Sequence, residues 1–324
     1  MKHIEKFVFL FVVIIAVFFA RYAYPTILGV PSFADTNTPQ TADAQTAASP
    51  PTLVLPQTSL SGADAAAVGN SATSTTSTGE TSSLPVFTNQ AYMVADLTTG
   101  NVLAGSNITK RWPTASITKL MTATLVLDQL SASTTITITP QMFAADPSEH
   151  TLVIGGTYTV GDLLHVMLMP SSNVAAQAMA DYIGTAQFMN EMNARATQWG
   201  MTDTYFADPS GISAANESSA NDLLILAQHI YENYPDILTL TNTPVTTITE
   251  LNSGKRITVR SINNFAGTPG FVGGKTGNTP QADGNLLSIF DYQSSPVFIT
   301  VLGAPALPFI DTSELYSWYK NDYK

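Results

Sequence analysis

Residues 116–130 read SITKLMTATLVLDQL, a stretch in which the apolar residues recur at helical spacing. The pattern predicts a helix of about four turns. Ser116 and Lys119 stand one turn apart on one face at its start, where backbone N–H groups have no helical partner. A serine in that position can meet a base and an oxyanion donor together, although an N-cap serine followed by a solvated lysine has the same spacing.

Two further motifs follow, each in a context that suits a functional loop or strand. Ser171-Ser172-Asn173 comes directly after Pro170 and opens another predicted helix, so its polar side chains can project from a loop. Gly273-Gly274-Lys275-Thr276-Gly277 lies on a predicted strand and is followed by Asn278. Each motif alone has an ordinary explanation, as a helix cap or a glycine-rich turn. In this order and these contexts, the three motifs indicate a site built around a nucleophilic serine.

Patterning over the rest of the chain predicts both strands and helices. Residues 92–97 and 101–103, which flank Thr98-Thr99-Gly100, indicate a β-hairpin. Further helices are expected at 160–168, 173–183, 186–199, 220–231 and 311–320. Further strands are expected at 135–139, 245–249, 257–260, 272–275, 286–291 and 297–302. Because strands lie near both ends of this region, we expect an α+β fold in which an antiparallel sheet, assembled from both ends of the domain, lies beside a helical cluster.

Composition excludes several classes of protein. The 324 residues are 44% hydrophobic, which excludes a wholly disordered chain, and the formal net charge of −11 disfavours nucleic-acid binding. The absence of cysteine excludes disulfides, thiolate nucleophiles and Cys-ligated metals. No metal or other cofactor is expected, because the histidines show no ligand spacing. No Gly-x-Ser-x-Gly elbow supports a Ser-His-Asp triad.

Residues 1–30 have the pattern of a membrane-seeking segment. Lys2 and Lys6 precede an uninterrupted apolar run over residues 7–20, which Arg21 ends. We expect an uncleaved transmembrane anchor, with a cleaved signal as the alternative. Residues 31–84 are rich in Ser, Thr, Ala and Pro and are expected to form a disordered linker, because they cannot bury enough apolar surface. Residues 85–324 are then a catalytic domain outside the cytoplasm, tethered to the membrane or exported.

From about residue 86 to residue 304 the chain resembles the serine-type D-alanyl-D-alanine carboxypeptidases, the low-molecular-mass penicillin-binding proteins. Besides the three motifs, the matching segments are Asp96, Thr99-Gly100, Val102-Leu103, Pro113-Thr114-Ala115-Ser116, Lys119-Leu120-Met121-Thr122 and Phe206-Ala207-Asp208-Pro209-Ser210-Gly211. The resemblance implies a β-lactamase/DD-peptidase-like fold. It also implies peptidoglycan stem peptides as substrates and β-lactams as covalent inhibitors.

The resemblance further implies an acyl-enzyme mechanism. Ser116 attacks the peptide carbonyl between two D-alanines, while Lys119, as a neutral amine, accepts its proton. Ser171 relays that proton to the leaving amine, and Asn173 holds Lys119 and the substrate amide. An ordinary lysine has a pKa near 10.4, so a base at Lys119 needs a pKa of about 7 or 8. Burial and the like charge of Lys275 are the expected causes of this shift.

The resemblance also implies that the Lys-Thr-Gly motif binds the substrate. Lys275 and Thr276, in the Lys-Thr-Gly motif that Gly277 completes, bind the terminal carboxylate. The backbone N–H groups of Ser116 and Asn278 form the oxyanion hole, in which each donor is typically worth about 3 to 4 kcal/mol.

Two features of the sequence keep alternatives to a carboxypeptidase open. No Lys or Arg occurs between Lys275 and Lys320, so an arginine that helps some relatives to hold the carboxylate has no evident counterpart. Arg256 and Arg260 are the candidates to replace it, and an endopeptidase of the same family is the first alternative. Glu217, in the segment ESSAN, keeps a class A-like β-lactamase as the second. The third is a catalytically silent module that binds the wall or senses β-lactams.

Overall fold

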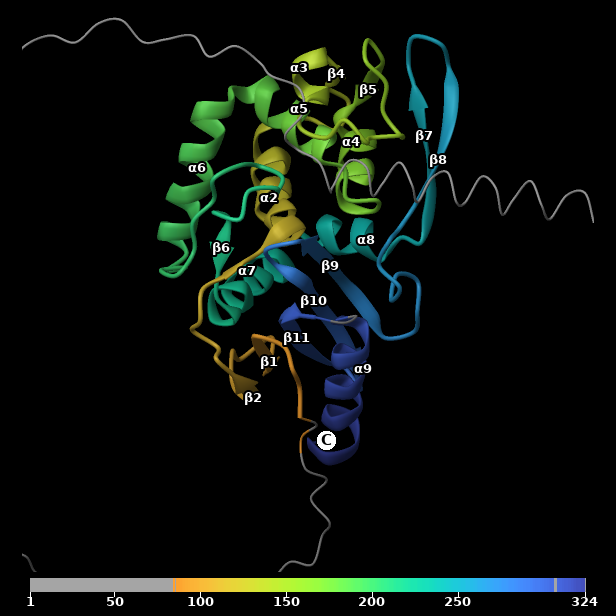
Figure 1. Ribbon diagram of the computed structural model, residues 1–324. Coiled ribbons are helices and arrows are strands. Elements are labelled where there is room, and N and C mark those ends of the chain that lie inside the picture. The colour runs from red at the N-terminus through yellow and green to blue at the C-terminus, as the bar shows by residue number, and fades with distance from the viewer. Residues whose placement is uncertain (1–83, 85, 306–307, 324) are drawn as a thin grey trace, which may run out of the picture. The chain divides into compact units, whose positions relative to one another are not determined.

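The computed structural model describes Leu84, residues 86–305 and residues 308–323, all within the compact unit Thr75–Lys324. The largest sheet of this part of the chain has five antiparallel strands. In spatial order they are β2 (Val102–Ser106), β1 (Ala91–Asp96), β11 (Ser295–Ala304), β10 (Asp283–Tyr292) and β9 (Phe271–Thr279). Two strands come from the start of the domain and three from its end (Figure 1). The predicted antiparallel sheet built from both ends is therefore confirmed.

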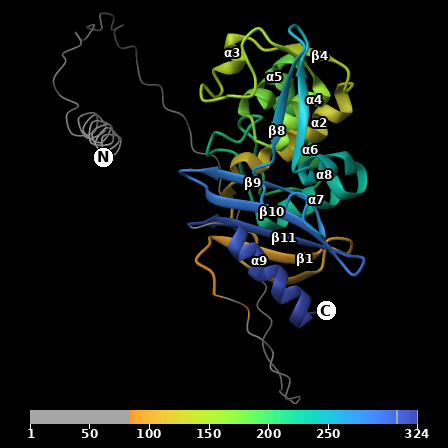
Figure 2. The same cartoon turned by 90° about the vertical axis from the view of Figure 1, so that its right-hand side faces the viewer.

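Strand β11 shows how both faces of the sheet are covered. Val297, Ile299 and Val301 belong to one apolar cluster with residues of α9 (Pro308–Trp318), whereas Phe298 and Leu302 belong to a larger cluster with residues of α7 (Ala220–Asn233). Successive strand side chains point to opposite faces, so a strand that is buried on both faces forms a continuous apolar run. Figure 2 shows α9 lying across the strands on one face of the sheet.

The helical cluster is arranged around α2 (Lys119–Gln129). Every residue of α2 from Lys119 to Val126 is buried. The helices that contact α2 are α4 (Val160–Leu168), α5 (Asn173–Ile183), α6 (Thr185–Gln198) and α8 (Pro235–Asn242). Because α2 is enclosed by neighbours, the residues of its first turn are held in a fixed and water-poor position.

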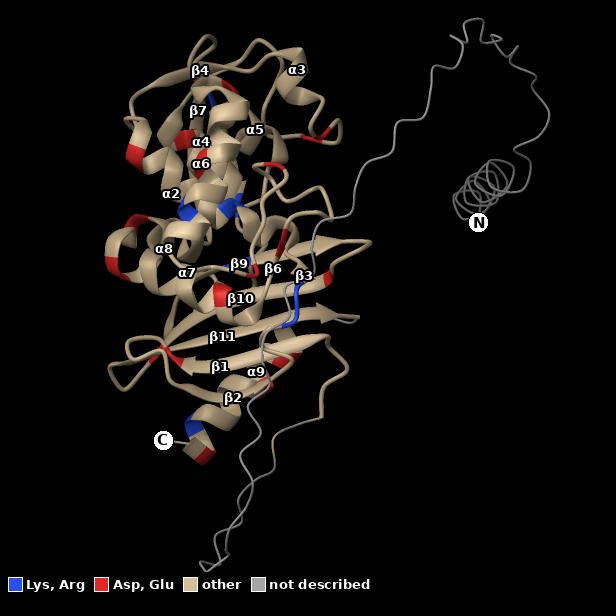
Figure 3. Ribbon diagram, turned by 90° about the vertical axis from the view of Figure 1, so that its left-hand side faces the viewer, with Lys and Arg blue, Asp and Glu red and all other residues tan. Residues whose placement is uncertain are grey.

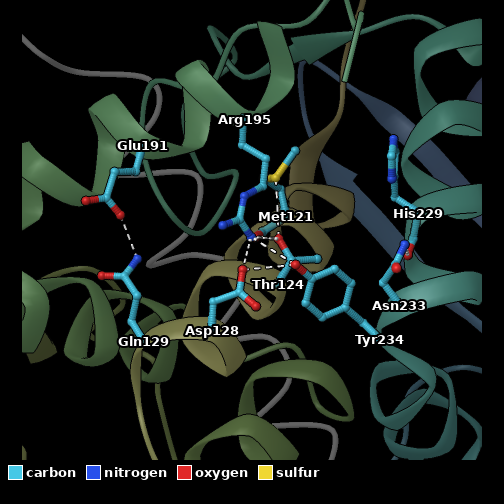
Figure 4. Close-up of polar contacts among 9 residues, drawn as sticks. All are labelled: Met121, Thr124, Asp128, Gln129, Glu191, Arg195, His229, Asn233 and Tyr234. Atoms are coloured by element: carbon cyan, nitrogen blue, oxygen red, sulfur yellow. Dashed lines mark hydrogen bonds and ion pairs between the residues drawn. The ribbon is translucent and has the colours of Figure 1, made fainter. Parts of the chain in front are cut away.

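A polar network ties the far end of α2 to other helices (Figure 4). Arg195 Nη1, on α6, lies 2.7 Å from Asp128 Oδ2, and Tyr234 Oη donates a hydrogen bond to the same oxygen at 2.9 Å. Gln129 Nε2 donates to Glu191 Oε2 at 2.6 Å. These contacts fix α2 at the end opposite to Lys119.

Most predicted elements match observed ones, with differences at their ends. The helices predicted at 160–168 and 173–183 have the bounds of α4 and α5. The helix predicted from residue 116 begins as a 3-10 turn, η1 (Ala115–Thr118), which leads into α2. The strand predicted at 135–139 is shorter, as β4 (Thr135–Thr137). It ends early because Thr139 Oγ1 accepts a hydrogen bond from Met142 N at 3.2 Å and caps α3 (Pro140–Phe143).

Several short elements were not expected from the sequence. They are α3, α8, the pair β3 (Trp112–Pro113) and β6 (Glu217–Ser218), β5 (Thr157–Thr159) beside β4, and the π-helical turn η2 (Tyr319–Tyr323). The strands predicted at 245–249 and 257–260 form a hairpin of β7 (Val245–Glu250) and β8 (Lys255–Arg260).

The expected anchor over residues 1–30 lies outside the described residues, as does the expected linker over 31–84 apart from Leu84. In the region that the structure does describe, no helix combines the length and apolar character needed to cross a bilayer. Figure 3 shows that Lys and Arg residues are few in this region.

Candidate active site

Ser116 lies on η1, in the turn that joins β3 to α2. The residue before it, Ala115, has φ +48°, a left-handed conformation that is uncommon for residues other than glycine. Strand β9 passes directly beside this turn. A Cβ atom on Gly277 would lie 2.6 Å from Thr114 O and 3.3 Å from Ser116 N. Gly277 is therefore the residue that allows the Lys-Thr-Gly strand to approach the backbone of Ser116.

Lys119 is fully buried, and its Nζ atom lies within hydrogen-bond distance of three oxygens. The distances are 2.8 Å to Ser116 Oγ, 2.8 Å to Asn173 Oδ1 and 2.6 Å to Ser210 O. The structure thus brings together Ser116, Lys119 and Asn173, which come from two of the predicted motifs.

The pKa values of Lys119 and Lys275 both lie below that of an ordinary lysine. Burial lowers the pKa of Lys119 to about 7, against the opposing effect of the Asp208 and Asp146 carboxylates, which raise it. Burial also lowers the pKa of Lys275 well below its ordinary value, and the charge of Lys119 lowers it further. Burial is therefore the leading cause of the low pKa at Lys119, and the like-charge effect that we expected between the lysines acts on Lys275.

Ser171 and Lys275 form a second serine–lysine pair. Lys275 Nζ donates hydrogen bonds to Ser171 Oγ at 2.8 Å and to Thr276 O at 3.1 Å, and only 1% of Lys275 is exposed. Thr276 and Gly277 continue along β9, and Asn278 follows them as an exposed residue. All three predicted motifs therefore meet at one place, where the edge strand β9 faces the Ser-Ser-Asn loop and η1.

The Ser-Ser-Asn motif keeps its capping role as well. Ser172 Oγ accepts a hydrogen bond from Ala175 N at 3.0 Å and caps the N-terminus of α5. Asn173 is consequently the first residue of that helix, and Ser171, at φ +71°, directs its hydroxyl to Lys275. One short motif thus supplies a structural cap and two active-site side chains.

Residues near Lys119 that the sequence did not single out include Asp208. Its carboxylate accepts hydrogen bonds from Ser210 N at 2.8 Å, Gly211 N at 2.7 Å and Ser213 N at 2.8 Å. Burial raises the pKa of Asp208, but hydrogen bonds from Ser213, Ser210 and Asn216 outweigh it and hold the pKa below its usual value. The carboxylate therefore stabilises the loop whose Ser210 carbonyl receives the Lys119 amine. Its only signal was the resemblance of residues 206–211 to the family.

Glu217 lies on β6, and Arg256 and Arg260 lie on β8. Glu217, on β6, forms an ion pair with Arg111, with Oε2 2.9 Å from Nη2. Arg256 and Arg260 are exposed on β8. Just beyond β8, Ile262 N donates to the carbonyl of Met169, two residues before Ser171, at 3.1 Å. The segment that follows β8 therefore contacts the residues just before the Ser-Ser-Asn motif. Within the described ranges, no group of three or more His, Cys, Asp or Glu residues is arranged to hold a metal ion.

A hydroxyl beside a lysine amine of low pKa is suited to acyl transfer through a serine ester, which is the chemistry of serine-type hydrolases. The model of the family described as D-alanyl-D-alanine carboxypeptidase matches residues 78–306, and the chain belongs to that family. The resemblance inferred from the motifs is therefore confirmed.

Proteins similar to this chain include a carboxypeptidase, an endopeptidase and a transpeptidase. The chain is 31% identical over 197 residues to a D-alanyl-D-alanine carboxypeptidase of Mycobacterium tuberculosis, covering 60% of this chain and 67% of that protein. It is 30% identical over 256 residues to the D-alanyl-D-alanine endopeptidase of Escherichia coli, covering 75% and 81%. The crystal structure of the Streptomyces K15 DD-transpeptidase matches with a TM-score of 0.67 and 27% identity, over 73% of this chain and 98% of that chain.

Proposed function

We propose that this protein removes the terminal D-alanine from peptidoglycan stem peptides through an acyl-enzyme on Ser116, with Lys119 as the base. The observation that carries the proposal is the set of three oxygens around Lys119 Nζ. A neutral amine has two hydrogens and one lone pair. Asn173 Oδ1 and Ser210 O can only accept, so they take the two hydrogens, and the lone pair is left for the Ser116 hydroxyl.

The proposed reaction begins with acylation of Ser116. Ser116 Oγ attacks the carbonyl carbon of the penultimate D-alanine as its proton passes to Lys119. The C–N bond breaks, and the leaving amine of the terminal D-alanine takes up a proton through Ser171. The Ser171 oxygen accepts a hydrogen bond from Lys275, which leaves its own hydrogen free to donate. Water later hydrolyses the ester and restores Ser116.

The carboxylate of the substrate is assigned to Lys275 and Thr276. A buried lysine with a low pKa gains a proton more readily when an anion binds beside it, because the opposite charge offsets the cost of burial. Lys275 thereby favours a substrate that ends in a free carboxylate. This argument supports a carboxypeptidase over an endopeptidase.

Endopeptidase activity is the second candidate. It is favoured by the lack of a Lys or Arg between Lys275 and Lys320, because an endopeptidase need not hold the same free carboxylate. Digestion of purified muropeptides separates the two, with products weighed by mass spectrometry. Loss of one alanine from pentapeptides supports the carboxypeptidase, and splitting of crosslinked dimers supports the endopeptidase. Rapid turnover of nitrocefin would instead indicate a β-lactamase.

The proposal also includes attachment to the membrane through residues 1–30. It rests on the sequence pattern, in which Lys2 and Lys6 precede the apolar run at 7–20. Fractionation of cells that express the full chain tests it against a variant that lacks residues 1–30. The full chain is expected in the membrane fraction with its catalytic domain accessible to added protease, whereas recovery in the culture medium would indicate a cleaved signal.

A further inference from the structure

The loop between α3 and β5 places two carboxylates against the Ser-Ser-Asn motif. Asp146 Oδ2 accepts a hydrogen bond from Asn173 Nδ2 at 3.1 Å, and Glu149 Oε2 accepts one from Ser172 Oγ. The loop also fixes its own conformation, since Asp146 Oδ1 accepts from Ser148 N at 3.0 Å. Nothing in the motif pattern assigns a role to these acids.

We propose that Asp146 is a positioning residue that sets the orientation of the Asn173 amide. A side-chain amide can rotate by half a turn, which would exchange its oxygen and its nitrogen. Asp146 permits only one choice, because an ionised carboxylate accepts and never donates. Nδ2 must therefore face Asp146, and Oδ1 must face Lys119, 2.8 Å away.

This orientation has two consequences for the proposed function, on which the inference rests. With Oδ1 toward Lys119, the lysine amine finds an acceptor and keeps its lone pair for Ser116. Nδ2 carries two hydrogens, of which Asp146 takes one. The other remains available, in a fixed direction, for the carbonyl oxygen of a bound peptide. In the opposite orientation, Asn173 would present donors to an amine that already donates.

The charge of Asp146 also acts on Lys119 from a distance. Titratable groups from several elements interact with this lysine: Asp146 from the α3–β5 loop, Asp208 from the loop before β6, and Lys275 from β9. Burial raises the pKa of Asp146, but hydrogen bonds from Ser148 and Asn173 and the charge of Lys119 hold it below its usual value, so Asp146 is ionised at neutral pH. Its charge in turn raises the pKa of Lys119.

Two substitutions separate these effects in the full-length protein. Asp146→Asn removes the charge but keeps an oxygen that can accept from Asn173, whereas Asp146→Ala removes both. The second-order rate of acylation by a fluorescent penicillin is measured from pH 5 to pH 9. Asp181→Asn is the matched control, because it makes the same change on α5, where Asp181 bonds Gln177 and Thr185 instead of Asn173.

For both Asp146 variants, the acid limb of the rate profile is expected to move to lower pH. Without the negative charge of Asp146, the protonated form of Lys119 is less stable, so its pKa falls and the amine is neutral in more acidic solution. Asp146→Ala is expected to lower the plateau rate by about tenfold, because it leaves the Asn173 amide without a partner, and Asp146→Asn by about twofold, because its amide can accept or donate and so permits both orientations of Asn173. Asp181→Asn keeps the wild-type acid limb. A wild-type plateau rate in Asp146→Asn overturns the inference even if Asp146→Ala fails to fold, because the orientation of Asn173 would then not depend on the carboxylate. Loss of labelling in the wild type would instead refute the proposed function.

Discussion

Gly211 packs so closely on Ala115 that a Cβ atom at position 211 would lie 1.8 Å from the Ala115 carbonyl oxygen. Gly211 has φ +83°, and Ala115, the residue before Ser116, has φ +48°. Two left-handed residues from distant parts of the chain thus meet behind the nucleophile. The Asp208 loop therefore both receives the Lys119 amine and supports the turn that carries Ser116.

This contact predicts a large effect for Gly211→Ala. The methyl group requires a backbone shift and also strains a positive φ, so unfolding should become easier by about 2 to 4 kcal/mol and penicillin labelling should fall sharply. Gly254→Ala is the matched control, since Gly254 has φ +70° but no atom near its Cβ position. Its expected cost is about 1 kcal/mol. Equal costs in denaturant unfolding would show that the contact with Ala115 does not matter.

Removal of the Lys119 amine tests the assignment of the base. Lys119→Ala should slow acylation by about 10²- to 10⁴-fold, the usual contribution of a general base. Wild-type acylation should rise with pH through about 7, where burial has placed the pKa of Lys119. Lys320→Ala, which removes a lysine from η2, should label like the wild type. A Lys119→Ala variant that labels at the wild-type rate would refute the assignment.

The same pKa predicts how stability depends on pH. The unfolded chain keeps a proton on Lys119 up to about pH 10.4, whereas the folded chain releases it near pH 7. Between these values the unfolded state binds more protons, so the free energy of unfolding rises with pH. From pH 7 to pH 9, the wild type should gain roughly 2 kcal/mol relative to Lys119→Met. Parallel pH profiles for the two proteins in urea unfolding would contradict this linkage.

The polar network at the far end of α2 is expected to contribute to stability and not to catalysis. Arg195→Met removes the contact with Asp128 and should lower the free energy of unfolding by about 1 to 2 kcal/mol, the range for a partly buried charged hydrogen bond. Lys255→Met, on the exposed strand β8, should change it by less than about 0.5 kcal/mol. Thermal unfolding of both variants checks the difference.

Local patterns carried much of the fold. The apolar spacing of α4 and α5 defined their ends, and the continuous apolar runs of β10 and β11 indicated central strands. The short helices and strands were not predicted, because no local sequence pattern specifies them. The pairing of Trp112 and Pro113 with Glu217 and Ser218 joins residues about a hundred positions apart, and only tertiary contacts create it.

The candidate site divides in the same way. Ser116, Lys119, Ser171, Asn173 and Lys275 stood in motifs with recognisable spacing. Asp146 stood in no motif, and Asp208 only in the segment 206–211 that resembles the family, because each acts through hydrogen bonds in loops whose shape the sequence does not reveal. The leading role of burial at Lys119 likewise depends on how completely neighbouring helices cover α2.

Mass spectrometry of the penicillin adduct tests the central claim most directly. The purified protein is incubated with benzylpenicillin at pH 8, digested and mapped by peptide mass. The account predicts one penicilloyl group, attached to the peptide that contains Ser116, and no adduct in Ser116→Ala. An unmodified protein, or an adduct on any other residue, would contradict it.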